Sequence, residues 1–168
     1  MKTFKSLILV VVTVLSFTVS NAQEEPAITH TKWVEASADD VWDVLRQMDD
    51  IQKYSSLIEK VKWTGAHGVG GERTCYSPDE NQGYYKERII EFNDDQRSYT
   101  YQVVEGVPAA GMVNMFKVVD LGYKSSLIVW TSNYEQFMEN PQMTEEQFIG
   151  FLNNAITEMT DKVALASN

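Results

Sequence analysis

The sequence predicts an α+β fold, in which a curved antiparallel sheet of seven strands is covered by one long C-terminal helix. Three observations lead to this class. Six strand-like segments follow one another between residues 58 and 136, separated by short turns rich in glycine, proline and asparagine. A seventh strand pattern lies near the N-terminus and precedes a short helical pattern. The chain closes with a long amphipathic helical pattern, which needs an apolar surface to cover.

The N-terminal elements are a strand and two short helices. β-Forming residues alternate over residues 28–36, which predicts the first strand. A helix is expected over residues 38–50, because Ser37 and Asp40 have the spacing of a capping box and apolar residues then recur at helical intervals. Residues 51–57 predict a second short helix or turn.

The middle of the chain predicts a meander of strands. Their expected positions are residues 58–64, 73–77, 84–92, 98–105, 112–121 and 126–136. The connections between them are short, which favours antiparallel neighbours.

The last element is a helix with a clear start. Thr144 can cap it, and Gln147 three residues later completes a capping box. Its apolar stripe consists of Phe148, Phe151, Leu152, Ala155, Ile156, Met159 and Val163. A single helix of ordinary diameter cannot fill the concave side of a strongly twisted sheet. We therefore expect an internal hollow that holds an apolar ligand or ordered water.

The N-terminus has the features of a secretory signal peptide. Lys2 and Lys5 precede an aliphatic run, and small residues up to Ala22 suit cleavage at that point. Residues 1–22 are expected to be removed, which leaves residues 23–168 as one periplasmic or secreted domain. The apolar run is short for a stable membrane span, and an uncleaved anchor helix is the alternative interpretation.

The chain is acidic, with 24 Asp and Glu against 14 Lys and Arg. Removal of the predicted signal peptide takes two lysines and moves the formal net charge from −10 to −12. Lys and Arg do not cluster, which argues against nucleic acid and anionic membrane surfaces as partners. Cys75 is the only cysteine, so it cannot form an intrachain disulfide, and we expect it to be a buried apolar side chain.

Four segments and the closing helix resemble the START-like, or helix-grip, superfamily (SRPBCC). The segments read ASADDVWDVL at residues 36–45, VGGER at 69–73, ERIIEFND at 87–94 and SLIVW at 126–130. The superfamily includes Bet v 1-type allergens, plant abscisic-acid receptors, and bacterial polyketide cyclase/dehydrase and lipid-transport proteins. The order of the segments implies the helix-grip fold over nearly the whole mature chain, whereas it implies little about the substrate.

The resemblance also implies which side chains face the hollow. Glu87 is singled out because the matching position in the abscisic-acid receptors lies in the ligand pocket, and strand alternation places Tyr85 and Ile89 on its face. A bulge near Ile89 and Ile90 would reverse the downstream face. The full predicted lining consists of Arg73, Cys75, Tyr85, Glu87, Ile89, Tyr99, Tyr101, Val103, Ile128, Trp130, Ser132, Phe148, Phe151, Leu152, Ile156 and Met159.

A carboxylate in an apolar hollow needs a partner, and Arg73 on the neighbouring strand can be that partner. In one interpretation, Glu87 and Arg73 orient a polar group of a mostly apolar ligand. Tyr99, Tyr101 and Trp130 then pack against the ligand's body. In the other interpretation, the pair is structural and the aromatic residues fill the core.

Other kinds of site are not predicted. His30 and His67 lack the spacing of metal ligands and no serine stands in a nucleophile elbow, so no metal, cofactor or covalent catalysis is expected. The glycine-rich turn at residues 65–71 lacks the Lys-Ser/Thr of a phosphate loop. This turn and residues 107–111 resemble loops beside the cavity mouth of the superfamily, where they gate entry or simply connect strands.

The sequence thus predicts an exported binder of a small hydrophobic molecule, present as a monomer or weak dimer. The ligand is expected to be a lipid, an aromatic polyketide-like compound or an isoprenoid. One alternative is a cyclase, dehydratase or hydrolase-like enzyme with Glu87 as general base. Another is an accessory protein that docks onto another exported protein by its acidic face.

Overall fold

The computed structural model describes residues 28–79 and 83–168, and the predicted signal peptide at residues 1–22 lies outside this part. The elements follow the order β1 (Ile28–Val34), α1 (Ala38–Leu45), a single 3₁₀ turn η1 (Ile51–Lys53), β2 (Lys60–Thr64), β3 (Glu72–Tyr76), β4 (Tyr84–Asn93), β5 (Ser98–Glu105), β6 (Ala109–Ala110), β7 (Val113–Gly122), β8 (Ser125–Asn133), β9 (Gln136–Phe137) and α2 (Glu145–Ala166).

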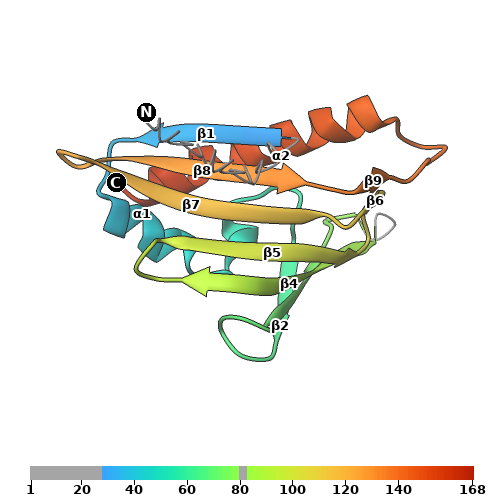
Figure 1. Ribbon diagram of the computed structural model, residues 1–168, viewed down its shortest axis with the longest axis horizontal. Coiled ribbons are helices and arrows are strands. Elements are labelled where there is room, and N and C mark those ends of the chain that lie inside the picture. The colour runs from blue at the N-terminus through green and yellow to red at the C-terminus, as the bar shows by residue number, and fades with distance from the viewer. Residues whose placement is uncertain (1–27, 80–82) are drawn as a thin grey trace, which may run out of the picture.

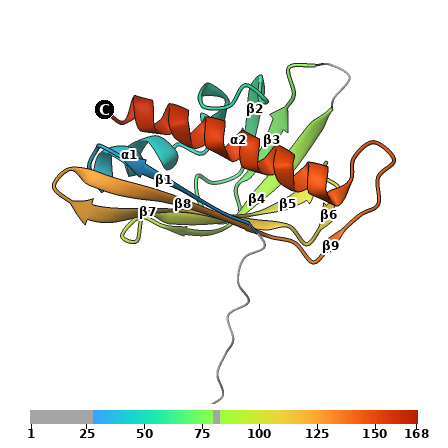
Figure 2. The ribbon, with the colours of Figure 1, turned by 90° about the horizontal axis from the view of Figure 1, so that it is seen from above.

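Seven of the strands form one antiparallel sheet in the order β1-β8-β7-β5-β4-β3-β2 (Figure 1). Figure 2 shows α1 and α2 on one side of this sheet, and the β2 end of the sheet curls toward that side. The sheet therefore has a concave face under the helices and a convex face on which the described residues place no helix. This arrangement confirms the predicted α+β class with a curved seven-stranded sheet and a long closing helix.

α1 is shorter than predicted because acidic residues follow it. The Ser37 hydroxyl accepts a hydrogen bond from the amide of Asp40 at 3.2 Å, as the capping pattern predicts. The helix ends at Leu45, since Asp49 and Asp50 would place negative charge at the negative end of the helix dipole. The second predicted helix is reduced to the single turn η1.

The strand predicted at residues 126–136 is divided into two. β8 ends at Asn133, and β9 pairs with β6 in a separate two-stranded sheet, where Ala109 lies opposite Phe137. β6 lies within residues 107–111, the loop for which no strand was predicted. The small sheet thus ties this loop to the segment that leads into α2 (Figure 1).

Two bulges set which side chains of β4 and β5 face the helices. β4 has one extra residue, Ile90, and β5 has one extra residue, Val104. Both are exposed. Because of the first bulge, Ile89 and Phe92 lie on the same face although they are three residues apart. The bulge considered at this position is therefore present, and Glu87 keeps the predicted face.

α2 begins with the predicted capping box and docks on β1. Thr144 and Gln147 exchange hydrogen bonds of 2.8 and 3.2 Å between their side chains and backbone amides. Farther along the helix, the Thr160 hydroxyl lies 3.1 Å from His30 Nε2 on β1. Among the described residues, no helix has the length and apolarity needed to span a membrane.

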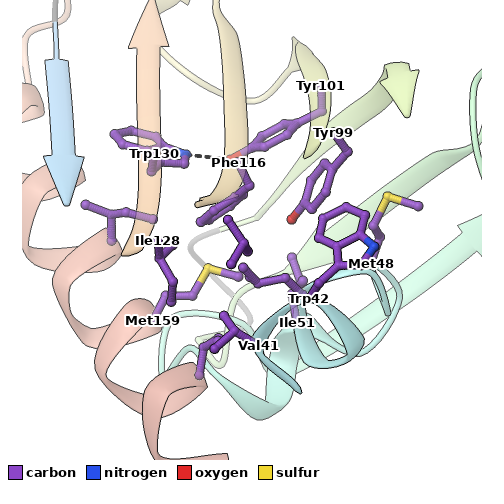
Figure 3. Close-up of a cluster of buried hydrophobic side chains, with 14 of the residues drawn as sticks. Val41, Trp42, Met48, Ile51, Tyr99, Tyr101, Phe116, Ile128, Trp130 and Met159 are labelled. Atoms are coloured by element: carbon purple, nitrogen blue, oxygen red, sulfur yellow. Dashed lines mark hydrogen bonds between the residues drawn. The ribbon is translucent and has the colours of Figure 1, made fainter. Parts of the chain in front are cut away.

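The core fills the space between the sheet and the two helices. Figure 3 shows side chains of β5, β7 and β8 meeting residues of α1 and α2. Phe116 and Ile128 are completely buried there, and Met159 covers them from α2. The concave face of the sheet is therefore the apolar centre of the protein.

Candidate functional site

An ion pair is buried on the concave face, between β3 and β4 toward the β2 edge of the sheet. β3 and β4 place Arg73 directly opposite Glu87. Arg73 Nε donates a hydrogen bond to Glu87 Oε2, and the two residues are only 1% and 5% exposed. The guanidinium also donates from Nη1 to the carbonyl of Met48 at 2.9 Å, which is available because α1 ends before this residue.

Aromatic rings surround the cation of this pair. The Arg73 guanidinium carbon lies 4.8 Å from the ring centre of Tyr101 and 5.9 Å from that of Tyr99. Burial is the largest single effect and opposes the charged form of Arg73, but Glu87 together with Tyr99, Cys75 and Tyr101 outweighs it and holds the arginine pKa well above its usual value. Arg73 therefore stays a cation within an apolar environment, stabilised by a carboxylate and two ring faces.

The two oxygens of Glu87 have different environments. Oε2 accepts the Arg73 hydrogen bond and lies 4.0 Å from Cys75 Sγ. Oε1 accepts no hydrogen bond from the described residues, and 6% of the Glu87 side chain remains exposed. A carboxylate has room for about four hydrogen bonds. The structure therefore shows Oε2 engaged by Arg73, while Oε1 has no hydrogen-bond partner among the described residues.

Cys75 and Tyr85 lie beside Glu87 on the same face. Cys75 is completely buried, and burial raises the pKa of its thiol to about 12. Burial also raises the pKa of the half-buried Tyr85 phenol. Both groups are therefore protonated at neutral pH, so the thiol is not a nucleophile and the phenol is a hydrogen-bond donor.

The floor of the site is aromatic. Tyr99 packs against Phe116 with ring centres 5.4 Å apart, and against Tyr101 at 5.8 Å. Trp130 Nε1 donates a hydrogen bond of 3.1 Å to the Tyr101 hydroxyl (Figure 3). Burial raises the pKa of both tyrosines, which keeps them neutral. These rings contact one another, so much of the predicted lining fills the core.

The structure brings most of the predicted lining residues together. The sheet residues that are buried on the concave face are Arg73, Cys75, Glu87, Ile89, Tyr99, Tyr101, Val103, Ile128, Trp130 and Ser132. Phe148, Ile156 and Met159 of α2 are also buried, whereas Tyr85 and Leu152 are partly buried against the core.

Phe151 is the exception, because 44% of it is exposed. The buried stripe of α2 passes through Phe148, Ile156, Met159 and Val163. At 100° per residue, Phe151 lies about 100° around the helix from the middle of this stripe. The prediction that Phe151 lines the hollow is therefore wrong.

Sequence reasoning missed the contribution of β7. Met112, Asn114, Phe116 and Val118 alternate along this segment, and all four are buried. Asn114 stands among otherwise apolar alternating positions, and this pattern in the sequence could have pointed to a polar contact on β7. Its side chain lies on the same face as Tyr101, directly opposite it in the sheet.

Two surface hollows lie away from the ion pair. One, of about 530 Å³, is lined by Asp43, Arg46, Gln47, Met48, Asp49, His67, Phe92 and Asp94. The other, of about 680 Å³, lies beside the edge strand β2 and is lined by Glu59, Lys60, Tyr76, Ser77, Asp79, Gly83 and Tyr84. Charged groups of the first already pair with each other, as Arg46 does with Asp94 at 3.0 Å. The candidate site is therefore centred on Glu87.

A curved antiparallel sheet that packs against a long C-terminal helix is the helix-grip arrangement. The profile of the polyketide cyclase/dehydrase and lipid transport family matches residues 25–164. The chain therefore belongs to this family, and the predicted superfamily is confirmed.

Solved structures share the fold. The XoxI protein of Bacillus cereus aligns with a TM-score of 0.71 at 21% identity, covering 83% of this chain and 93% of that one. Norcoclaurine synthase from Thalictrum flavum, in complex with dopamine and hydroxybenzaldehyde, aligns with a TM-score of 0.65 at 23% identity, covering 96% and 95%. A Nitrosospira multiformis protein aligns at 0.69 and 17%, covering 84% and 95%. Comparison with curated proteins gives no significant match.

Proposed function

We propose that this protein binds a small, mostly apolar molecule on the concave face and holds one hydrogen-bond donor of that molecule at Glu87 Oε1. The observation that carries the proposal is a carboxylate that is 5% exposed, with Oε2 engaged by Arg73 and Oε1 without a partner among the described residues. An ionised carboxylate oxygen only accepts hydrogen bonds, so a ligand hydroxyl or amino group suits this position.

The surroundings of Glu87 favour an apolar body for the ligand. Val103 lies directly opposite Glu87 on β5, and Tyr101 follows on the same face. Leu152 of α2 and Phe137 of the β6–β9 sheet are partly buried and pack against the core. Apolar and aromatic surface with a few fixed polar groups is typical of small-molecule sites.

The chemistry of the neighbouring groups suits the binding of a neutral ligand. The Cys75 thiol is protonated, and Tyr85, Tyr99 and Tyr101 are neutral phenols. Within residues 28–79 and 83–168, no group of three or more His, Cys, Asp and Glu side chains could hold a metal ion. These residues can orient and desolvate a ligand, which is what a carrier or sensor requires.

The test compares wild-type protein with Glu87→Gln and with Glu91→Gln, after purification from the native host. Glu91 lies on the same strand but is exposed on the convex side, so it serves as the matched control. Native mass spectrometry is expected to show a co-purifying molecule with a hydroxyl or amino group in wild type and Glu91→Gln, and less of it in Glu87→Gln. Wild-type protein without any bound molecule, or equal occupancy in all three, would contradict the proposal.

We also propose that the protein acts outside the cytoplasm. The support is the positive, apolar and small-residue pattern that ends at Ala22. Cell fractionation with intact-mass analysis is expected to find a mature chain that begins at Gln23 in the periplasm or medium. An intracellular chain that still carries residues 1–22 would overturn this proposal.

A further inference from the structure

Four buried polar atoms on the concave face lack hydrogen-bond partners within the described residues, and two of them belong to Asn114 and Ser132 on neighbouring strands. Asn114 of β7 is 2% exposed and Ser132 of β8 is completely buried. Within the described part of the chain, neither Asn114 Oδ1 nor Ser132 Oγ makes a hydrogen bond. Buried polar atoms without partners are rare in folded proteins, and each needs a physical explanation.

The two side chains are neighbours in the sheet. Asn114 lies directly opposite Ser132 on β8, and opposite Tyr101 on β5. Side chains at directly opposite positions share a face, so both polar atoms belong to the same concave surface as Tyr101. They form a small polar patch within apolar surroundings.

This patch lies at a defined separation from Glu87. Asn114 is two strands away from Glu87 and two residues farther along, because Val103 lies opposite Glu87 and Tyr101 lies opposite Asn114. A strand spacing of about 4.8 Å and a rise of about 3.3 Å per residue give roughly 12 Å between their Cα atoms. The surface between them carries Val103 and Tyr101, which are apolar or aromatic.

We infer that Asn114 and Ser132 form a second polar contact for the ligand that Glu87 binds. The ligand class is an elongated apolar molecule with a hydrogen-bond donor, a hydroxyl or an amino group, at each end. The amide oxygen of Asn114 requires a donor, and the Ser132 hydroxyl can accept one or donate in return. This inference rests on the proposed function, because it assigns the other end of the same bound molecule.

The negative charge of Glu87 narrows the class of ligand further. Glu87 is a carboxylate whose positive partner, Arg73, already contacts Oε2 and two aromatic rings. An anionic head group placed against Oε1 would repel it. Fatty-acid anions are therefore excluded at this end, while neutral diols, amino alcohols and phenols that carry a second hydroxyl fit both contacts.

The experiment uses two probes of equal chain length, octanol and the octanediol with a hydroxyl at each end. Tryptophan fluorescence reports binding, since Trp130 lies beside Tyr101. The dissociation constants of both probes are measured for wild type, Asn114→Leu, Ser132→Ala and Ser126→Ala. Ser126 is the matched control: it is also buried on β8 with an unpaired hydroxyl, but it lies about 20 Å along the strand from Ser132.

The readout is the preference for the diol, which is the dissociation constant of octanol divided by that of the octanediol. Asn114→Leu and Ser132→Ala are each expected to lower this preference about fivefold, as loss of one hydrogen bond predicts, whereas Ser126→Ala leaves it unchanged. Ser132→Ala removes only one oxygen, so it keeps the test valid if Asn114→Leu is unstable. If both probes bind and the preference is the same in all variants, the second contact is wrong while the proposed function stands. If neither probe binds wild type, both are wrong.

Discussion

Removal of the Arg73 side-chain charge tests how the buried pair contributes to stability. In Arg73→Met, the apolar stem is kept but Glu87 loses its cation and the Met48 carbonyl loses its donor. Breaking a buried ion pair from one side costs about 3–5 kcal/mol, because a charge is left buried without compensation. Cation–π contacts with two tyrosine rings add about 1 kcal/mol. We therefore expect the free energy of unfolding to fall by about 4–6 kcal/mol.

The double variant Arg73→Met with Glu87→Leu separates the charge from the packing. With both charges removed, the apolar pair is expected to be about 2 kcal/mol more stable than Arg73→Met alone. The exposed pair of Arg88 and Glu72 is the control, since it joins the same two strands on the convex face with atoms 2.6 Å apart. Arg88→Met is expected to cost under about 1 kcal/mol.

Urea unfolding followed by tryptophan fluorescence measures all of these free energies. A loss near 4 kcal/mol is a large part of the stability of a typical domain, so little folded Arg73→Met protein would remain at high temperature. The baseline of this variant at low urea must therefore be recorded at moderate temperature. The reasoning is refuted if Arg73→Met costs no more than Arg88→Met. The single variant Glu87→Leu is measured as well. The reasoning is also refuted if the stability lost by the double variant equals the sum of the losses of Arg73→Met and Glu87→Leu, because the two side chains would then contribute independently.

Three further predictions follow from burial. Burial lowers the pKa of His30 below 6.5, although Asp161 opposes this effect, so the folded protein binds this proton more weakly than the unfolded chain does. The melting temperature of the wild-type protein is therefore expected to fall as the pH drops below about 6.5, and to fall less in His30→Gln. Because the Cys75 thiol is buried with a pKa of about 12, a chromogenic disulfide reagent is expected to react only after unfolding, and prompt reaction of native protein would count against the described packing. Phe148→Ala is expected to cost about 3–4 kcal/mol in urea unfolding and Phe151→Ala under about 1 kcal/mol, and similar losses would mean that the helix is rotated.

Much of the site followed from the family resemblance, with strand periodicity in agreement. The resemblance placed Arg73, Tyr99 and Tyr101 toward the same hollow as Glu87, and alternation along β4 agreed for Glu87. The register shows that Arg73 and Glu87 are direct neighbours. Alternation works because the side-chain period of a strand is two, which is a local property.

Other features could not be read locally. Which of Ile89, Ile90 and Phe92 faces inward depends on a bulge, and a bulge arises from pairing between strands. The exposure of Phe151 depends on how α2 is rotated against the sheet, which its own sequence leaves open within one helical turn. The contact between Arg73 and the Met48 carbonyl depends on where α1 ends relative to β3, elements that are distant in the chain.

The sequence by itself determined the order of the elements, the faces of the strands and the capped, amphipathic helix that closes the sheet. These depend on the spacing of apolar residues and on hydrogen bonds between residues close in the chain. Only the tertiary structure decided which oxygen of Glu87 is engaged, and that Asn114 and Ser132 are neighbours without partners. Such facts depend on the register between strands and on the docking of the helices, because hydrogen bonds are satisfied by atoms that folding brings together.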